Sequence, residues 1–181
     1  MRKTILSLSF VYQTAFAQID QIDKIEIAGD YMQIALPLTA WATTLMLDDT
    51  EGQMAFYKSF GATVVTTQVL KYTFDAKRPN GGDRSFPSGH TSASFHGAAS
   101  IHFRYGFQYA VLAYVAAGFV GYSRVISGQH HLHDVIGGAI IGTGAAWYFT
   151  EPYTIKQVQV QPIVSYSLLN KQNIYGLSLS F

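Results

Sequence analysis

Three apolar runs, separated by polar or glycine-containing segments, constrain this chain most. They cover residues 34–47, 109–122 and 135–149. Residues 53–74 and the segment after Ser88 also carry apolar side chains at helical spacing. The pattern predicts an all-α core, because such runs recur with helical rather than alternating periodicity over most of the chain.

Composition narrows the class of protein further. Of 181 residues, 49% are apolar and only 13% are charged, which favours a membrane-adjacent or deeply packed helical protein. The net charge of +1 comes without any basic run, so nucleic acid is not an expected partner. The chain has no cysteine, which excludes thiol chemistry and disulfides.

The N-terminal residues are typical of an export signal. Arg2 and Lys3 precede a mostly apolar stretch, and Ala15-Phe16-Ala17 offers a small-x-small cleavage site. We therefore expect a signal peptide at 1–17 and a periplasmic or cell-envelope location. The alternative is an amphipathic first helix that stays attached.

Residues 18–152 form the expected helical domain. Within it, 18–30 suits a short amphipathic helix that Gly29-Asp30 would end, and Pro79 is expected to end the helix over 53–74. A span needs about 20 apolar residues, more than any of the three runs offers. Length thus favours a soluble or peripheral bundle, with an integral membrane protein as the alternative.

The C-terminal segment 153–181 has a different pattern. Apolar residues occupy alternate positions from Val158 to Leu168 and from Tyr175 to Phe181, with a polar break at 170–173. Alternating apolar residues interrupted by a short polar segment predict a β-hairpin. We expect this hairpin to pack on the domain or to pair with a neighbouring molecule.

Two clusters supply groups that a phosphate needs. Lys71 and Arg78 are seven residues apart, which on one helix would place both cations on the same face. Pro87-Ser88-Gly89-His90 follows a loop and precedes a helical pattern. The unpaired N–H groups at such a helix start bind anions well. Each cluster alone is better explained by surface charge or by a capped helix.

The third cluster is the most specific. Ser123-Arg124 is followed by His130 and, four residues later, Asp134. At that spacing the carboxylate can hold one imidazole nitrogen and leave the other as a nucleophile. A metal site is the alternative, because His131 and His133 are adjacent, but it leaves the three cations unexplained. His96 and His102 are interpreted as ordinary helix residues.

Together the three clusters resemble the three-part signature of the type 2 phosphatidic acid phosphatase / vanadium haloperoxidase superfamily. The resemblance implies a bundle of about six helices with the site at one end of the core helices. It also implies His130 as nucleophile, His90 as acid and base, and Asp134 as the group that orients His130. The implied phosphate ligands are Lys71, Arg78, Ser88, Gly89 and Arg124, with no metal or cofactor.

The expected activity is therefore hydrolysis of a phosphomonoester or a lipid phosphate or diphosphate, such as phosphatidate or polyprenyl diphosphate. Two alternatives remain. One is a vanadate-dependent haloperoxidase, since vanadate mimics the phosphoryl transition state at the same residues. The other is a non-catalytic envelope protein with a degenerate site.

Overall fold

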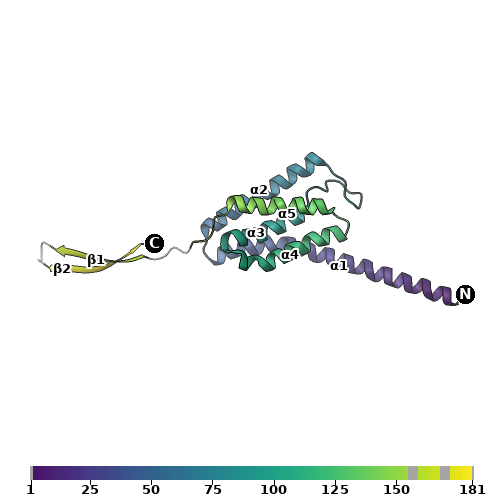
Figure 1. Ribbon diagram of the computed structural model, residues 1–181, viewed down its shortest axis with the longest axis horizontal. Helices are drawn as coiled ribbons and strands as arrows, with labels where there is room; N and C mark the ends of the chain where they lie inside the picture. Colours follow the sequence, from purple (N-terminus) through teal and green to yellow (C-terminus); the bar gives the residue numbers. More distant parts are fainter. Residues whose placement is uncertain (1, 155–158, 168–171, 181) are drawn as a thin grey trace.

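The computed structural model of the chain describes residues 2–154, 159–167 and 172–180. In these ranges five helices pack side by side into an elongated bundle, and a two-stranded hairpin follows (Figure 1). The helices are α1 (Arg2–Met46), α2 (Thr50–Phe74), α3 (Gly89–Tyr105), α4 (Phe107–Ile126) and α5 (Leu132–Phe149). The all-α core is as expected, with five helices in the described residues where about six were expected.

The difference in number comes from α1. Gly29-Asp30 was expected to end a short helix, but α1 runs through this pair and also contains Pro37. A Cβ atom on Gly29 would lie 2.1 Å from the Ser123 hydroxyl oxygen of α4, so this glycine allows a close helix contact. Tertiary packing therefore overrides a local helix-breaking signal. The predicted cleavage after residue 17 remains a prediction.

The end of α2 also differs from the prediction. The helix begins after Asp49, whose carboxylate accepts the Gly52 N–H at 2.9 Å. It ends at Phe74, because Asp75 adopts a left-handed conformation with φ of 39°. Pro79 therefore lies in the following loop and does not end the helix. Lys71 is helical and Arg78 is not, so the prediction that both project from one helix face is wrong.

The other helix ends follow local signals. Ser88 caps α3, and Gly106, with φ of 112°, separates α3 from α4. His131 precedes the first turn of α5. These ends place the residues of the three sequence clusters at one end of the bundle, where α2 and α4 finish and α3 and α5 start.

The bundle has an unusual distribution of side chains. Helix α3 lies at its centre and contacts all four other helices. Small and polar side chains of α3 make these contacts, and Ala98, Ser94 and His96 are fully buried. His96 Nε2 lies 2.7 Å from the Ser59 hydroxyl of α2. A Cβ atom on Gly142 would lie 2.2 Å from the Ser92 carbonyl oxygen, which shows how closely α5 approaches α3.

Large apolar side chains instead cover the outside of the helices. Leu112 is 82% exposed and Trp147 66% exposed. The exposed set extends over α1, α2, α4 and α5 and includes Ile34, Leu38, Val65, Val69, Val115, Ile136 and Ile140. Among the described helices, α4 alone combines the length and mean hydropathy (1.4) of a membrane-crossing segment.

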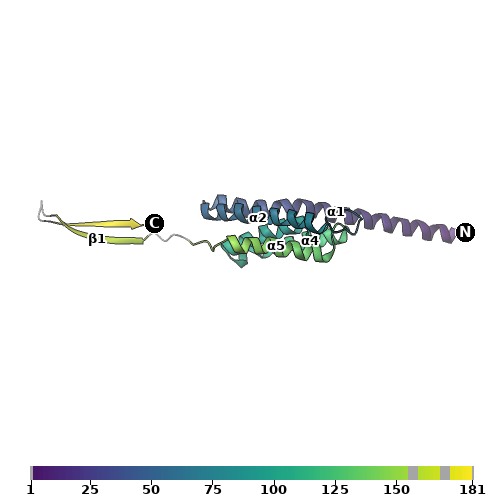
Figure 2. The same cartoon turned by 90° about the horizontal axis from the view of Figure 1, so that it is seen from above.

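The C-terminal segment contains strands β1 (Gln159–Ser167) and β2 (Gln172–Ser180), which pair antiparallel with Gln159 opposite Ser180. Neither strand contacts a helix within the described ranges, and Figure 2 shows the pair beyond the bundle. The expected packing of a hairpin on the domain is thus not seen there. Val158, Leu168, Phe181 and the first half of the expected polar break, residues 170 and 171, lie outside the described residues.

Candidate active site

The predicted nucleophile and its carboxylate lie together at the start of α5. His130 and Asp134 are both buried, and His130 Nδ1 is 3.6 Å from Asp134 Oδ2. The same oxygen accepts a hydrogen bond from the Ser85 hydroxyl at 2.5 Å and from the His131 N–H at 2.8 Å. Fixed donors on one carboxylate oxygen hold Asp134 in place beside the imidazole.

The surroundings of His130 favour its neutral form. Burial lowers the pKa of His130 to about 4, and the positive charges of Lys71 and Arg78 act in the same direction. Asp134 opposes this shift, and His90 adds to it. A neutral imidazole has the free lone pair that a nucleophile needs.

The start of α3 is built as predicted. The Ser88 hydroxyl accepts hydrogen bonds from the Thr91 N–H and hydroxyl, and the Ser88 N–H donates to the Asp134 carbonyl oxygen at 2.9 Å. A Cβ atom on Gly89 would lie 3.8 Å from Lys71 Cε. The lysine stem therefore passes over the first turn of α3, where unpaired N–H groups are available to an anion.

The loop between α2 and α3 positions the cations. Lys71 Nζ donates to the Arg84 carbonyl oxygen at 2.8 Å. Arg78 Nε donates to the Asp83 carbonyl oxygen at 3.1 Å, and its Nη1 donates to the Gln129 side chain at 3.0 Å. Gln129 immediately precedes His130, so this contact ties Arg78 to the loop that carries the predicted nucleophile.

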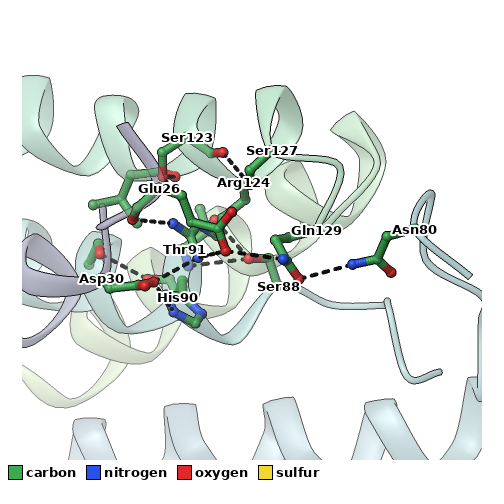
Figure 3. Close-up of polar contacts among 12 residues, drawn as sticks. Glu26, Asp30, Asn80, Ser88, His90, Thr91, Ser123, Arg124, Ser127 and Gln129 are labelled. Carbon is green, nitrogen blue, oxygen red and sulfur yellow. Dashed lines mark hydrogen bonds and ion pairs between the residues drawn. The ribbon is translucent and has the colours of Figure 1, made fainter. Parts of the chain in front are cut away.

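Helix α1 brings acidic groups that the sequence patterns did not single out (Figure 3). Asp30 Oδ1 lies 3.0 Å from His90 Nε2 and accepts a hydrogen bond from Arg124 Nη1 at 2.8 Å. Arg124 Nη2 donates to the Glu26 carbonyl oxygen at 2.7 Å. The Glu26 carboxylate accepts from the Gln129 side-chain amide at 3.0 Å.

Two of the other histidines, His96 and His102, contact hydroxyl groups within the helical bundle. His96 is buried beside Ser59, and His102 Nδ1 lies 3.1 Å from the Tyr114 hydroxyl. His131 and His133 are exposed on the outer side of Asp134. All eight predicted site residues thus lie at one end of the bundle, and Asp30, Glu26, Ser85 and Gln129 join them.

The structure thus brings a buried His–Asp pair, a second histidine and three cations together at one end of a helical bundle. The model of the PAP2 superfamily matches residues 80–156. The lipid A 4'-phosphatase of Helicobacter pylori is 34% identical over 176 residues, covering 87% of this chain and 84% of that protein. The chain belongs to the PAP2 superfamily, as its motifs indicated.

Two further similarities are more limited. The lipid A 1-phosphatase of Porphyromonas gingivalis is 41% identical over 97 residues, which cover 50% of this chain but 22% of that longer protein. The crystal structure of Aquifex aeolicus LpxE has a TM-score of 0.58 and 21% identity, covering 71% of this chain and 91% of that one. The latter similarity establishes the helical fold.

Proposed function

We propose that the chain is a membrane-embedded, metal-independent phosphatase that removes phosphate from a lipid through a phosphohistidine intermediate. The observation that carries the proposal is the buried His130–Asp134 pair, which lies at the same end of the bundle as Lys71, Arg78 and Arg124.

The roles follow from the contacts. His130 Nε2 attacks phosphorus while Nδ1 faces Asp134, forming an N–P bond as the ester P–O bond breaks. Protonated His90 gives its proton to the departing oxygen. A water molecule then attacks phosphorus, His90 accepts its proton, and the N–P bond breaks to release phosphate. Asp30 positions His90 throughout.

The phosphate ligands would stabilise negative charge and would form no covalent bond to the substrate. Lys71, Arg78 and Arg124, with Ser88 and the Gly89 N–H, would surround the equatorial oxygens, which carry the charge in the transition state. Because the cations are held by carbonyl oxygens and by Gln129 and Asp30, little reorganisation is needed when the substrate arrives.

The outer surface supports membrane embedding. Exposed apolar side chains cover four helices, while polar groups such as Ser59 and His96 are inside. A lipid-facing surface explains this distribution, because monomeric soluble proteins rarely expose large apolar patches. Small residues between helices also suit association in lipid. We therefore favour the integral alternative over the peripheral one.

The lipid A phosphatases of two bacteria, similar to this chain, support a lipid phosphate substrate. The proposed position of the bundle in the membrane is an independent reason to expect a lipid substrate. A lipid headgroup reaches the end of a membrane-spanning bundle without leaving the bilayer. Lipid A, phosphatidate and polyprenyl diphosphate are the substrates to compare. We place the site on the outer side of the cell membrane, facing the periplasm.

The test uses purified protein in detergent with these three lipids and p-nitrophenyl phosphate. We expect lipid phosphate release that EDTA does not reduce. His130→Ala should abolish turnover and the acid-labile phosphoenzyme, whereas His102→Ala should retain both. Undiminished activity in His130→Ala would refute the mechanism. Absence of activity on all four substrates would support a non-catalytic protein.

A further inference from the structure

A cluster of metal-ligating atoms lies on the outer side of the His130–Asp134 pair. His131, His133 and Asp134 each offer one atom, and these atoms lie within 4.8 Å of one another. His131 Nδ1 is 3.5 Å from Asp134 Oδ2, and His133 Nε2 is 3.1 Å from Asp134 Oδ1. The phosphatase chemistry proposed above uses neither of these two histidines.

The two oxygens of Asp134 have different surroundings. Oδ2 accepts hydrogen bonds from Ser85 and from the His131 N–H. Oδ1 is buried and accepts no hydrogen bond from any residue that the structure describes. His133 Nε2, at 3.1 Å, faces Oδ1 without a hydrogen bond between them. Because a buried carboxylate oxygen without a hydrogen bond is costly, a cation shared by Oδ1 and His133 would stabilise this side of Asp134.

The geometry suits zinc. Zinc binds histidine nitrogen and carboxylate oxygen at about 2.0–2.2 Å, so the edges of its tetrahedral ligand set are about 3.4 Å long. His133 Nε2 is 3.1 Å from Oδ1, which is close to that edge. His131 Nδ1 is 3.5 Å from Oδ2, and the three ligand atoms lie within 4.8 Å of one another, so the His131 imidazole would rotate toward Oδ1 on binding. The imidazole rings of His131 and His133 lie nearly parallel, 5.1 Å apart, and both are exposed, so an ion can enter from solvent.

We propose that His131, His133 and Asp134 form a zinc site that inhibits the enzyme reversibly, with water as the fourth ligand. Zinc on Oδ1 would place a double positive charge on the carboxylate whose other oxygen faces His130 at 3.6 Å. Asp134 would then stabilise less of the positive charge that His130 acquires when it attacks phosphorus. The zinc binding does not depend on the proposed function, but the inhibition rests on it.

The test titrates zinc chloride into the purified protein in detergent, in a buffer without phosphate, by calorimetry. We expect one zinc ion per chain in the wild type. The paired substitution of His131→Gln and His133→Gln should weaken binding at least tenfold. His102→Gln, at the opposite end of α3, is the matched control and should bind zinc as the wild type does.

Activity provides the second readout. Zinc should lower kcat in the wild type and in His102→Gln, and EDTA should restore it. The paired variant should keep its activity without zinc, within about twofold, and should need at least tenfold more zinc for half inhibition. Equal zinc binding or an equal half-inhibitory concentration in wild type and paired variant would overturn the proposal. If no variant hydrolyses any substrate, the calorimetry still decides whether the site exists.

Discussion

Asp30 and His90 lie 60 residues apart in the sequence, yet Asp30 Oδ1 is 3.0 Å from His90 Nε2. The same oxygen accepts a hydrogen bond from Arg124, so one carboxylate from α1 connects the proposed acid to a proposed phosphate ligand. The first helix is therefore part of the site rather than a support for it.

The first prediction concerns this contact. Asp30→Asn keeps the shape of the side chain but removes the charge that favours protonated His90, so kcat should fall by about tenfold or more. The limb of the pH–rate profile that requires protonated His90 should move to lower pH. Asp23→Asn, an exposed substitution on the same helix, is the control. An unchanged profile in Asp30→Asn would exclude a positioning role.

The second prediction concerns Ser85. Its hydroxyl donates to Asp134 Oδ2, and hydrogen bonds to charged groups contribute about 1.5–3 kcal/mol. Ser85→Ala should therefore reduce kcat by about tenfold, because Asp134 is held less firmly beside His130. Ser127→Ala removes a hydrogen bond to the Ser123 carbonyl oxygen and leaves Asp134 untouched, so its kcat should stay near that of the wild type. Equal rates in the two variants would contradict this role.

The third prediction compares two glycines of α5. In Gly142→Ala the new methyl group would meet the Ser92 carbonyl oxygen at 2.2 Å, so α5 must move away from α3. We expect a loss of about 1–3 kcal/mol, seen as a lower Tm in detergent. Gly144 has nothing within 4 Å of a Cβ atom, so Gly144→Ala should raise stability by up to about 1 kcal/mol. A similar Tm for both variants would show that the helices are not in close contact.

The fourth prediction concerns the opposite end of the bundle. Asp49 and Arg104 form a buried ion pair at 2.5 Å, and Tyr105 also donates to Asp49. Burial raises the pKa of Asp49, but hydrogen bonds from Arg104, Gly52 and Tyr105 outweigh it and leave the pKa below its ordinary value.

Since the folded-state pKa is lowered, the stabilising contribution of Asp49 is present above its unfolded-state pKa of about 3.9. The contribution should be lost as the pH falls below about 4, and unfolding followed between pH 6 and 3 should show it. Asp49→Asn should lower Tm at pH 6 and flatten the decline toward pH 3. Lys24→Gln, which removes an exposed ion pair with Asp20, should leave the profile unchanged.

The sequence was most informative where function depends on residues close in the chain. His130 and Asp134 are four residues apart, and the Ser88 cap lies beside His90, so local spacing was enough to bring them together. The sequence was least informative about contacts between distant segments. Asp30 looked like part of a helix break, and nothing near it in the chain indicates that it meets His90 and Arg124.

The predicted helix boundaries were wrong for a related reason. Helix propensity would end a helix at Gly29, but close contact with α4 needs a residue without a side chain there. Pro79 was an apparent helix stop, but the left-handed Asp75 ends α2 first. Arg78 thereby gains the loop geometry that connects it to Gln129, which no helical repeat could have indicated.

Arg104 also determines where the chain leaves the bundle. Its guanidinium donates to the Glu151 carbonyl oxygen at 2.8 Å, and its own carbonyl oxygen accepts the Tyr153 N–H at 2.6 Å. Arg104 lies in the last turn of α3, whereas His90 lies in its first turn. In a bilayer, substrate phosphate and Tyr153 would thus belong to different compartments. A sealed vesicle that exposes the active site to added substrate should shield an epitope fused after the C-terminal strands from added antibody.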